Sequence, residues 1–400
     1  MQTVTINKSH VSGEINAISS KSYAHRLLIC SFLANKELFL SGLDLSNDIT
    51  ATYNALIALK NGEKILDAGE SGSTLRFLLP LVSVIGGEYQ IKMHGKLASR
   101  PNDDLYRVLK LGGVEAYTSG DTAYVNGKLK SGEYFIKADK SSQYLSGLLM
   151  ALASLDKESK LVLETQISSK SYVDITVEVL KSFGYHVEQK DNAYIVGGER
   201  KEISTPAVCE GDWSNSAFFL VAGIINGDIR VKNLNPKSVQ ADRRILDIIR
   251  LAGGDISEEN GCIRAKKSNV KGFTYSVDSC PDLAPICAVL GAYASGETVL
   301  TDIQRLKLKE SDRVLSTIAM LTSCGINAKE ENGKIIIKGG KVSGGEIDGF
   351  NDHRIVMAGA VMALGSQDEI TINGANAVEK SYPKFFTDLE KLGGIISAKV

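Results

Sequence analysis

Apolar positions along the chain gather into two kinds of run, and the two kinds alternate. The first kind opens on small polar residues and continues for about a dozen mostly apolar residues, which is typical of a helix buried on all sides. Runs of this kind begin near Ser19, Ser71, Ser141, Gly211, Cys280 and Asn351. The repetition predicts that one structural unit occurs six times.

A more amphipathic run follows each of these and usually ends at a glycine, which predicts a second helix with one face in solvent. The second runs read NDITATYNALIALKNG, PNDDLYRVLKLGG, SYVDITVEVLKSFG, ADRRILDIIRLAGG, ESDRVLSTIAMLTSCG and SYPKFFTDLEKLGG. Segments such as VEAY after Gly113 and HVEQ after Tyr185 predict intervening strands. Chance recurrence of helices is the alternative, but it does not explain a spacing of roughly 70 residues after a first step of about 50.

Six units divide naturally into two domains of three units, which suits a length of 400 residues. If the N-terminal strand belongs with the second half, the domains are 20–209 and 1–19 plus 210–400. The chain would then cross between them near 17–20 and 208–211, and such a pair of crossings forms a hinge.

The composition excludes several classes of protein. A net charge of -1 creates no overall field that would attract nucleic acid or an anionic membrane. The six cysteines form no C-x-x-C pair and no metal-binding spacing, so we expect reduced thiols and no metal. No run reaches the length of a membrane span, and the N-terminus lacks the apolar core of a signal peptide. We therefore expect a cytoplasmic protein.

Basic residues occur at predicted helix starts, where the helix dipole ordinarily favours acids. They are Lys21, Arg26, Arg76, Arg100, Arg313 and Arg354. Bound anions would explain this arrangement, because helix starts bind phosphate and carboxylate groups. Serines at the same places can cap helices or bind phosphate oxygens. These serines are Ser20, Ser22, Ser71, Ser73, Ser141, Ser142 and Ser169. Capping is the commoner role for one serine alone, but the neighbouring cations favour anion binding.

Three segments also contain candidates for acid and base chemistry. In KLKESDR, the Glu310 carboxyl group lies between Lys309 and Arg313, an arrangement that suits proton exchange. Asp282 lies at the corresponding helix start one repeat earlier. In NDHR, we interpret Asp352 as a helix cap and His353 as a buried, hydrogen-bonded side chain.

Ten segments, in this order, resemble the 5-enolpyruvylshikimate-3-phosphate synthase family. They read SKSYAHR, SGSTLR, SRPNDDL, SSQYL, SKSYVDIT, EGDWSNSAFFL, PDLAP, KLKESDR, NDHR and EKSYP, and they extend from Lys21 to Pro383. The resemblance implies an α/β (α+β) fold: a two-domain inside-out α/β barrel of βαβαββ-type units that closes on its substrates. It also implies transfer of the enolpyruvyl group from phosphoenolpyruvate to the 5-hydroxyl of shikimate 3-phosphate, with release of phosphate, in chorismate and aromatic amino acid biosynthesis. No cofactor or metal is implied, and we expect a monomer.

The resemblance assigns roles to individual residues. Contacts to shikimate 3-phosphate would come from Lys21, Ser22, Arg26, Ser141, Ser142, Gln143, Ser169, Asp282 and Lys309. Contacts to phosphoenolpyruvate would come from Lys21, Gly72, Arg100, Gln143, Arg313, Arg354 and Lys380. Asp282 would accept the proton of the substrate hydroxyl, and Glu310 with Lys21 would relay a proton at the methylene carbon.

The sequence departs from the family pattern at three of these segments. His25 stands where asparagine is usual, Glu70 where it is common, and Arg305 replaces another asparagine. A carboxylate at position 70 would be unfavourable near an anion unless a cation pairs with it.

Two other functions compete with this interpretation. UDP-N-acetylglucosamine enolpyruvyl transferase shares the fold but carries a cysteine before the Arg-Pro pair matched here by Arg100 and Pro101, where this chain reads MHGKLAS. A repeat scaffold that binds phosphorylated partners would explain the cations, but it would not explain Asp282 and Glu310 at matching helix starts.

Overall fold

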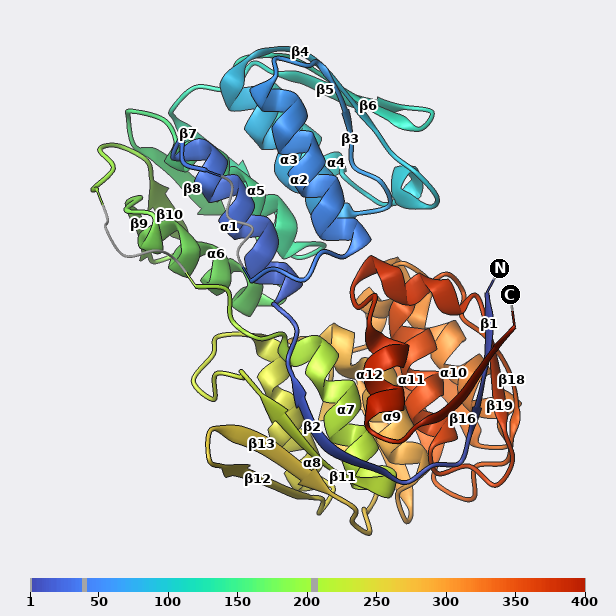
Figure 1. The fold of residues 1–400 in the computed structure, drawn as a ribbon. Coiled ribbons are helices and arrows are strands. Elements are labelled where there is room, and N and C mark those ends of the chain that lie inside the picture. Colours follow the sequence, from blue (N-terminus) through green and yellow to red (C-terminus); the bar gives the residue numbers. More distant parts are fainter. Residues whose placement is uncertain (1, 38–41, 203–207, 400) are drawn as a thin grey trace. The chain divides into compact units, whose positions relative to one another are not determined.

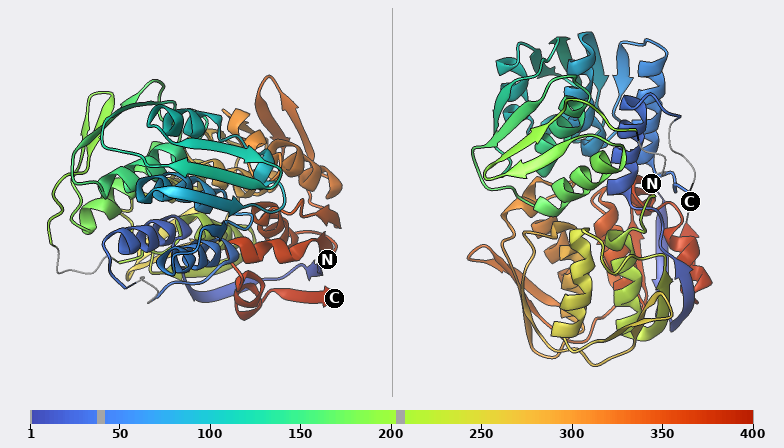
Figure 2. Two further views of the ribbon diagram at one scale, coloured as in Figure 1. Left: turned by 90° about the horizontal axis from the view of Figure 1, so that it is seen from above. Right: turned by 90° about the vertical axis from the view of Figure 1, so that its left-hand side faces the viewer.

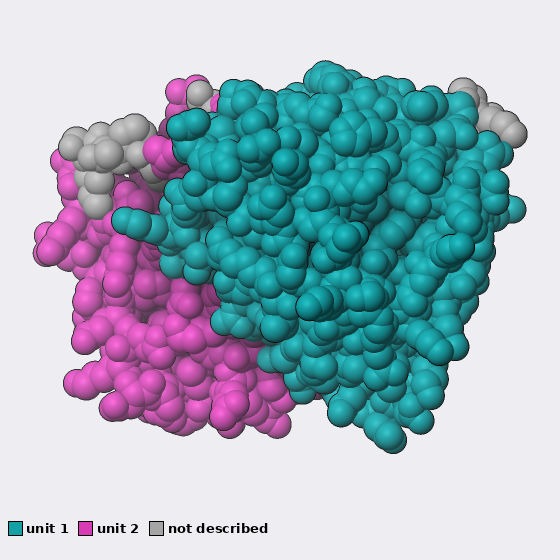
Figure 3. Space-filling model, turned by 90° about the horizontal axis from the view of Figure 1, so that it is seen from below, with its two compact units in different colours: residues 1–18, 210–400 teal, residues 19–209 magenta. Residues whose placement is uncertain are grey.

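The computed structural model describes residues 2–37, 42–202 and 208–399, and its contacts divide the chain into two compact units. Unit 1 comprises Met1–Ile18 and Glu210–Val400, and unit 2 comprises Ser19–Cys209. Figure 1 shows the elements in sequence colours, and Figure 3 colours the two units separately. Each unit has its own hydrophobic core.

Unit 2 contains six α-helices within its described residues. Its elements are α1 (Lys21–Leu33), α2 (Asn47–Lys60), β3 (Ile65–Asp67), α3 (Gly72–Ile85), β4 (Gly87–Lys92), η1 (Leu97–Ser99), α4 (Asp103–Leu111), β5 (Glu115–Ser119), β6 (Thr122–Gly127), β7 (Glu133–Ile136), α5 (Ser142–Ala153), β8 (Ser159–Leu163), α6 (Lys170–Ser182), β9 (Val187–Lys190) and β10 (Ala193–Val196).

Unit 1 begins with two strands and resumes after the whole of unit 2. Its elements are β1 (Thr3–Asn7), β2 (Val11–Asn16), α7 (Trp213–Asn226), β11 (Gly227–Lys232), η2 (Ala241–Arg244), α8 (Ile245–Leu251), β12 (Asp255–Glu259), β13 (Cys262–Lys266), β14 (Thr274–Ser276), η3 (Pro281–Leu283), α9 (Ala284–Ala292), β15 (Glu297–Thr301), η4 (Gln304–Leu308), α10 (Arg313–Ser323), β16 (Asn327–Glu331), β17 (Lys334–Lys338), β18 (Gly345–Asp348), α11 (His353–Ala363), β19 (Ile370–Asn373), η5 (Ala375–Lys380), α12 (Phe385–Lys391) and β20 (Ile395–Lys399).

Five four-stranded sheets share one topology in the part of the chain that the structure describes. In the pattern of β14-β15-β17-β16, a first helix connects two parallel strands, and a second helix leads into an antiparallel hairpin. The orders β3-β4-β6-β5, β7-β8-β10-β9 and β2-β11-β13-β12 follow it. The predicted first repeat has α1 and α2, but residues 38–41 and 203–207 around it lie outside the described residues.

The two ends of the chain complete the last repeat together. Its sheet has the order β18-β19-β1-β20, so the N-terminal strand takes the place that the final hairpin strand has elsewhere. Figure 2 shows β1 and β20 side by side near both termini. Residues 11–16 form the first strand of the repeat that continues after Glu210. The N-terminal strands therefore belong to unit 1.

The predicted difference between first and second helices is confirmed. Every residue of α7, α9 and α11 is buried, and these three helices pack against one another inside unit 1, with the sheets outside. In unit 2, α5 packs against α1 and α3. By contrast, α2 buries only four of its 14 residues. No described helix combines the length and apolar character needed to cross a membrane.

Short side chains allow the central helices to approach the sheets closely. A Cβ atom on Gly223 of α7 would lie 2.5 Å from the carbonyl oxygen of Ala265 in β13. Because that neighbour is backbone, it can move only if the strand moves. The buried helix therefore needs glycine at this position although glycine is a poor helix former.

We predict that Gly223→Ala lowers the free energy of unfolding by about 1–3 kcal/mol, the usual cost of overfilling a packed core. Urea unfolding monitored by circular dichroism measures this. Gly340→Ala is the matched control, since a Cβ there meets nothing within 4 Å and the residue is exposed. Equal stability of the two variants would contradict the packing argument.

Candidate active site

In the repeats, the start of the second helix lies beside the start of the first. The two strands that precede these helices are parallel neighbours, so both helices begin at the same edge of the sheet. Side chains 27 residues apart therefore meet, as in Lys21 with Asp48 and Asp282 with Lys309. The same offset joins the backbone N–H of Trp213 to the side chain of Gln240. The helix starts are thus where each unit collects its polar groups.

In unit 2, Lys21 begins α1 and forms an ion pair with Asp48 at the start of α2, with 2.7 Å between Nζ and Oδ2. One repeat later, Gly72 begins α3 and lies against Arg100. A Cβ on residue 72 would lie 2.8 Å from the Arg100 guanidinium, so a larger residue here would displace that side chain. The structure thus brings the predicted pair Gly72 and Arg100 together.

The Arg26 guanidinium is held inside unit 2. It donates to Thr176 Oγ1 at 2.6 Å, to the carbonyl oxygens of Ser22 and Tyr172, and to Ser146 Oγ. It also lies over the ring of Phe77. Burial lowers the pKa of Arg26 to about 10. Arg26 therefore ties α1 to α5 and α6.

Arg76 orients a predicted ligand-binding amide. Its Nη1 donates to Gln143 Oε1 at 2.7 Å, and its Nε donates to Asn102 Oδ1 at 3.0 Å. Gln143 Nε2 then donates to Ser73 Oγ at 2.8 Å. With its oxygen occupied by Arg76, the Gln143 side chain offers donors to any further partner.

The serines at the helix starts divide into two groups. Ser71 and Ser141 cap α3 and α5, each accepting a backbone N–H within its own helix start. Ser20 and Ser169 precede helices without a side-chain capping bond. Ser169 is buried and has a φ of 51°, a left-handed conformation that side chains rarely adopt outside functional or constrained sites. Ser142 begins α5 and is also buried.

In unit 1, three carboxylates surround one buried guanidinium, that of Arg313. Its Nε and Nη2 donate to Asp352, its Nη1 donates to Asp282 at 2.7 Å, and its Nη2 donates to Glu310 at 2.8 Å. Burial opposes the charge, but the three carboxylates keep the pKa of Arg313 well above its usual range. Arg313 therefore fixes the positions of the two acidic residues predicted to be catalytic.

Asp282 lies among three cations. Its Oδ1 accepts from Lys309 at 3.2 Å and from Arg313, and its Oδ2 lies 3.7 Å from Arg354 Nη2. Burial raises the pKa of this carboxyl group, but Lys309, Arg313 and Arg354 together hold it well below 3.8. Burial also lowers the pKa of Lys309, and Asp282 opposes that shift. Asp282 is thus a fixed anion at ordinary pH.

Arg354 is a buried cation with two unused donors among the described residues. It is 2% exposed, lies over the ring of Phe218, and has Asp282 as its ion-pair partner at 3.7 Å. Its Nε and Nη1 atoms are buried and make no hydrogen bond with any described residue. Leaving such donors unbonded is costly, so the geometry favours an anionic ligand at Arg354.

The remaining predicted residues have simpler surroundings. Asp352 caps α11 by accepting the backbone N–H of Arg354, which confirms the predicted capping role. His353 is buried, as predicted, with Nδ1 4.0 Å from Asp352. Lys380 ends η5 and donates to the carbonyl oxygen of Asn351 at 2.8 Å.

The three departures from the family pattern lie in different settings. Glu70 is exposed, and its carboxylate lies over Gly95. Arg305 lies within η4, and its guanidinium donates to the carbonyl oxygen of Asp278 at 3.1 Å. His25 is buried in the core of unit 2, where its Nδ1 lies 2.7 Å from Thr52 Oγ1.

Sequence reasoning missed two acidic residues of these sites. Asp48 could have been found from the repeat offset, since it stands to Lys21 as Lys309 stands to Asp282. Asp242 is buried in η2, and burial followed by the charge of Asp282 raises its pKa to about 6. Nothing local in the sequence indicates this, because the neighbouring charge comes from another repeat.

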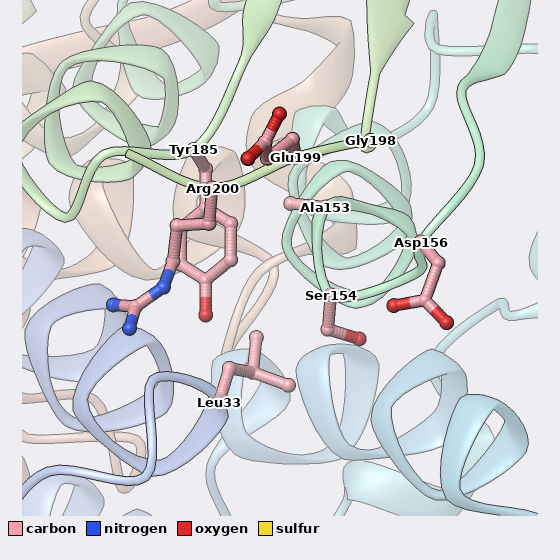
Figure 4. A pocket seen from close by; sticks show the side chains of 8 residues that line it. All are labelled: Leu33, Ala153, Ser154, Asp156, Tyr185, Gly198, Glu199 and Arg200. Atoms are coloured by element: carbon pink, nitrogen blue, oxygen red, sulfur yellow. The ribbon is translucent and has the colours of Figure 1, made fainter. Parts of the chain in front are cut away.

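A separate pocket of about 400 Å³ lies at the other end of the unit 2 helices (Figure 4). Its lining includes Leu33, the last residue of α1, and Ser154, which follows the end of α5. Arg200 and Tyr185 also line it. Helix C-termini carry partial negative charge, so this end disfavours anions. No described cluster of three His, Cys, Asp or Glu side chains is arranged to hold a metal ion.

Sequence comparison places these sites in a known family. Residues 6–65 and 59–389 match the family described as EPSP synthase (3-phosphoshikimate 1-carboxyvinyltransferase). The 3-phosphoshikimate 1-carboxyvinyltransferase of Clostridium novyi is 37% identical, with 99% of this chain and 98% of that protein aligned. The enzyme of the same name from Clostridium acetobutylicum is 36% identical, with 98% of each chain aligned.

Structure comparison agrees. EPSP synthase from Acinetobacter baumannii has a TM-score of 0.82 at 26% identity over 100% of both chains. An enolpyruvyl transferase from Streptomyces tendae shares the fold with a TM-score of 0.75 at 14% identity, covering 100% of this chain and 98% of that one. These neighbours support the inside-out α/β fold. With matches over nearly its whole length, the chain belongs to the EPSP synthase (3-phosphoshikimate 1-carboxyvinyltransferase) family.

Proposed function

We propose that this protein transfers the enolpyruvyl group of phosphoenolpyruvate to the 5-hydroxyl of shikimate 3-phosphate and releases phosphate. Family membership supports the reaction class, that of a transferase of the shikimate pathway. The observation that carries the proposal to this chain is Arg354, a buried guanidinium whose Nε and Nη1 lack partners among the described residues. A planar guanidinium matches a carboxylate or phosphate group with parallel hydrogen bonds.

Both substrates are anions, and the helix starts supply the groups that bind anions. In unit 1, Arg354, Lys309 and Lys380 surround the starts of α10 and α11. In unit 2, Lys21 and Arg100 lie at α1 and beside α3, where Gly72 leaves room for close approach. We assign Arg100, Arg354 and Lys380 with Gly72 to phosphoenolpyruvate, and Ser22, Ser141, Ser142 and Ser169 to shikimate 3-phosphate. Gln143 and Lys21 serve both ligands.

Asp282 is our candidate for the group that accepts the hydroxyl proton. Its pKa lies well below 3.8, so the carboxylate is ionised and available as an acceptor. Anions bound at Arg354 and Lys309 would offset the cations that lower this pKa and strengthen Asp282 as a base. Glu310 is held by Arg313 and is partly exposed, and we propose that it exchanges a proton with the substrate together with Lys21.

Arg26 and Arg313 differ from the other proposed contacts. Their donors are already engaged with protein groups, so we propose that they mainly position neighbouring residues. Arg313 holds Asp282 and Glu310, and Arg26 holds α1 against α6.

We place the protein in the cytoplasm, in keeping with the absence of a disulfide bond among the described cysteines. We also propose that the two crossings near 17–20 and 208–211 act as a hinge. The first crossing is held on both sides, at Ser19 in unit 2 and at Ile18 in unit 1. Ser19 exchanges two hydrogen bonds with Asp44 in unit 2. In unit 1, the backbone N–H of Asp212 donates to the carbonyl oxygen of Ile18.

Release of inorganic phosphate from phosphoenolpyruvate tests the activity directly. We expect release with shikimate 3-phosphate and none with UDP-N-acetylglucosamine, the substrate of the rival transferase. Activity with the nucleotide sugar instead would overturn the proposal.

Asp282→Asn should lower kcat on the order of a hundredfold or more, because asparagine cannot accept the proton. Phosphate release measures kcat, and calorimetry should still detect binding of shikimate 3-phosphate. Asp247→Asn on the exposed face of α8 is the control and should leave kcat unchanged. Unchanged turnover in Asp282→Asn would remove the assignment.

Arg354→Lys keeps the charge but loses the planar pair of donors. We predict that KM for phosphoenolpyruvate rises roughly tenfold or more, since hydrogen bonds between charged groups are strong. KM for shikimate 3-phosphate should change much less. Arg264→Lys, in an ion pair with Asp228 on the sheet, provides a matched control. Loss of stability without a change in KM would indicate a purely structural role for Arg354.

A further inference from the structure

A chain of four buried side chains connects the starts of three helices in unit 2. His25 Nδ1 on α1 lies 2.7 Å from Thr52 Oγ1 on α2, and Thr52 Oγ1 lies 2.7 Å from Thr74 Oγ1 on α3. Thr74 Oγ1 lies 2.8 Å from Ser71 Oγ. All four residues are at most 1% exposed. Polar groups buried this deeply are costly unless they are bonded, so the chain is a constraint on the three helices.

The chain lies one helical turn below groups assigned to substrate. His25 follows Lys21 by four residues on α1, and Thr52 follows Asp48 by four on α2, so each pair shares a helix face. Lys21 and Asp48 form an ion pair at 2.7 Å. At the other end, Ser71 precedes Gly72, which lies against Arg100.

The direction of the hydrogen bonds follows from one fixed acceptor. Thr74 Oγ1 lies 3.3 Å from the backbone carbonyl oxygen of Asp48, which can only accept, so Thr74 points its proton toward Asp48 and Ser71. Thr52 must then donate to Thr74, and His25 Nδ1 must donate to Thr52. The ring is neutral, because burial and then the charges of Lys21 and Arg26 hold the pKa of His25 well below 6.5.

The opposite tautomer of His25 would reverse the direction of the hydrogen bonds along these four side chains. With the proton on Nε2, Thr52 would donate to His25 and Thr74 would donate to Thr52. The carbonyl oxygen of Asp48 would lose the Thr74 donor, and Ser71 would turn its own proton inward. Two groups of Thr74, its backbone N–H and its hydroxyl, approach the Ser71 hydroxyl. Only the Nδ1–H form of His25 leaves Ser71 as the acceptor for both.

We propose that His25 is a positioning residue: its Nδ1–H sets the direction of the chain through Thr52 and Thr74, which fixes Asp48 beneath Lys21 and fixes the Ser71–Gly72 turn. The inference rests on the proposed function, since it assigns to His25 the alignment of groups that bind phosphoenolpyruvate. Three of the four serines assigned to shikimate 3-phosphate, Ser141, Ser142 and Ser169, lie at the starts of α5 and α6, away from these hydrogen bonds, whereas Ser22 lies on α1.

Two matched variants test the Nδ1–H donor. Asparagine places an N–H at the position of Nδ1, whereas leucine places a methyl group there. His25→Leu should lower kcat/KM for phosphoenolpyruvate about tenfold, the loss expected for one buried hydrogen bond that aligns a site. KM for shikimate 3-phosphate should change less than about threefold, and His25→Asn should recover most of the lost kcat/KM.

A second pair interrupts the chain at its centre. Thr52→Val removes the hydroxyl group at constant shape and should reproduce His25→Leu, whereas Thr52→Ser should behave as the unmodified protein. Urea unfolding provides the control for stability. If leucine and asparagine at position 25 give equal kcat/KM and differ only in unfolding free energy, the residue is merely structural and the proposal fails.

Nitrogen-15 NMR of the His25 ring tests the tautomer without any assay of activity. We expect a protonated Nδ1 and an unprotonated Nε2, and a change in the Nδ1 signal in Thr52→Val. A protonated Nε2 would overturn the proposal even in a fully active enzyme. If instead the unmodified protein releases no phosphate from the two substrates, the proposed function fails, while the NMR result still decides the direction of the chain.

Discussion

Parallel pairing of the first two strands in the five described sheets is the constraint on which most of the site residues depend. Because those strands point the same way, the helices that follow them begin at one edge of the sheet. Backbone N–H groups and the positive ends of the helix dipoles therefore gather at that edge. Side chains that are far apart in sequence, such as Asp282 and Lys309, meet there without any special loop.

Basic residues at such an edge must be balanced, and the two units do this differently. Unit 1 surrounds Arg313 with Asp282, Glu310 and Asp352. Unit 2 uses Asp48 for Lys21 but neutral acceptors for Arg26 and Arg76. Several of the cations that suggested anion binding are therefore satisfied by the protein itself. The clearest evidence for a ligand comes from Arg354, where two buried donors lack described partners.

The parts of the fold that were predictable depend on local pattern. Continuous apolar runs identified the buried helices, and glycines identified the ends of the amphipathic ones, because burial and capping act within a few residues. Asp352 was recognisable as a cap for the same reason. The pairing of β1 with β20 was not predictable in detail, because it joins residues at opposite ends of the chain.

The candidate site was predictable as a set of residues but not as a set of contacts. Resemblance supplied Asp282, Arg313 and Arg354, whereas the sequence could not show that Arg313 is enclosed by carboxylates while Arg354 is not. That difference depends on the distances between side chains of three repeats. Asp242 escaped notice for the same reason, since its raised pKa comes from burial and from Asp282.

The electrostatics of unit 1 suggest why a strongly acidic Asp282 suits the proposed reaction. Lys309, Arg313 and Arg354 hold its pKa well below 3.8. A carboxylate with so low a pKa is a weak base, so it accepts few protons from water or from stray hydroxyl groups. Binding of two anionic substrates adds negative charge beside the same cations and raises the pKa. Under the proposed function, basicity at Asp282 is therefore greatest when both substrates are in place, which couples proton transfer to occupancy of the site.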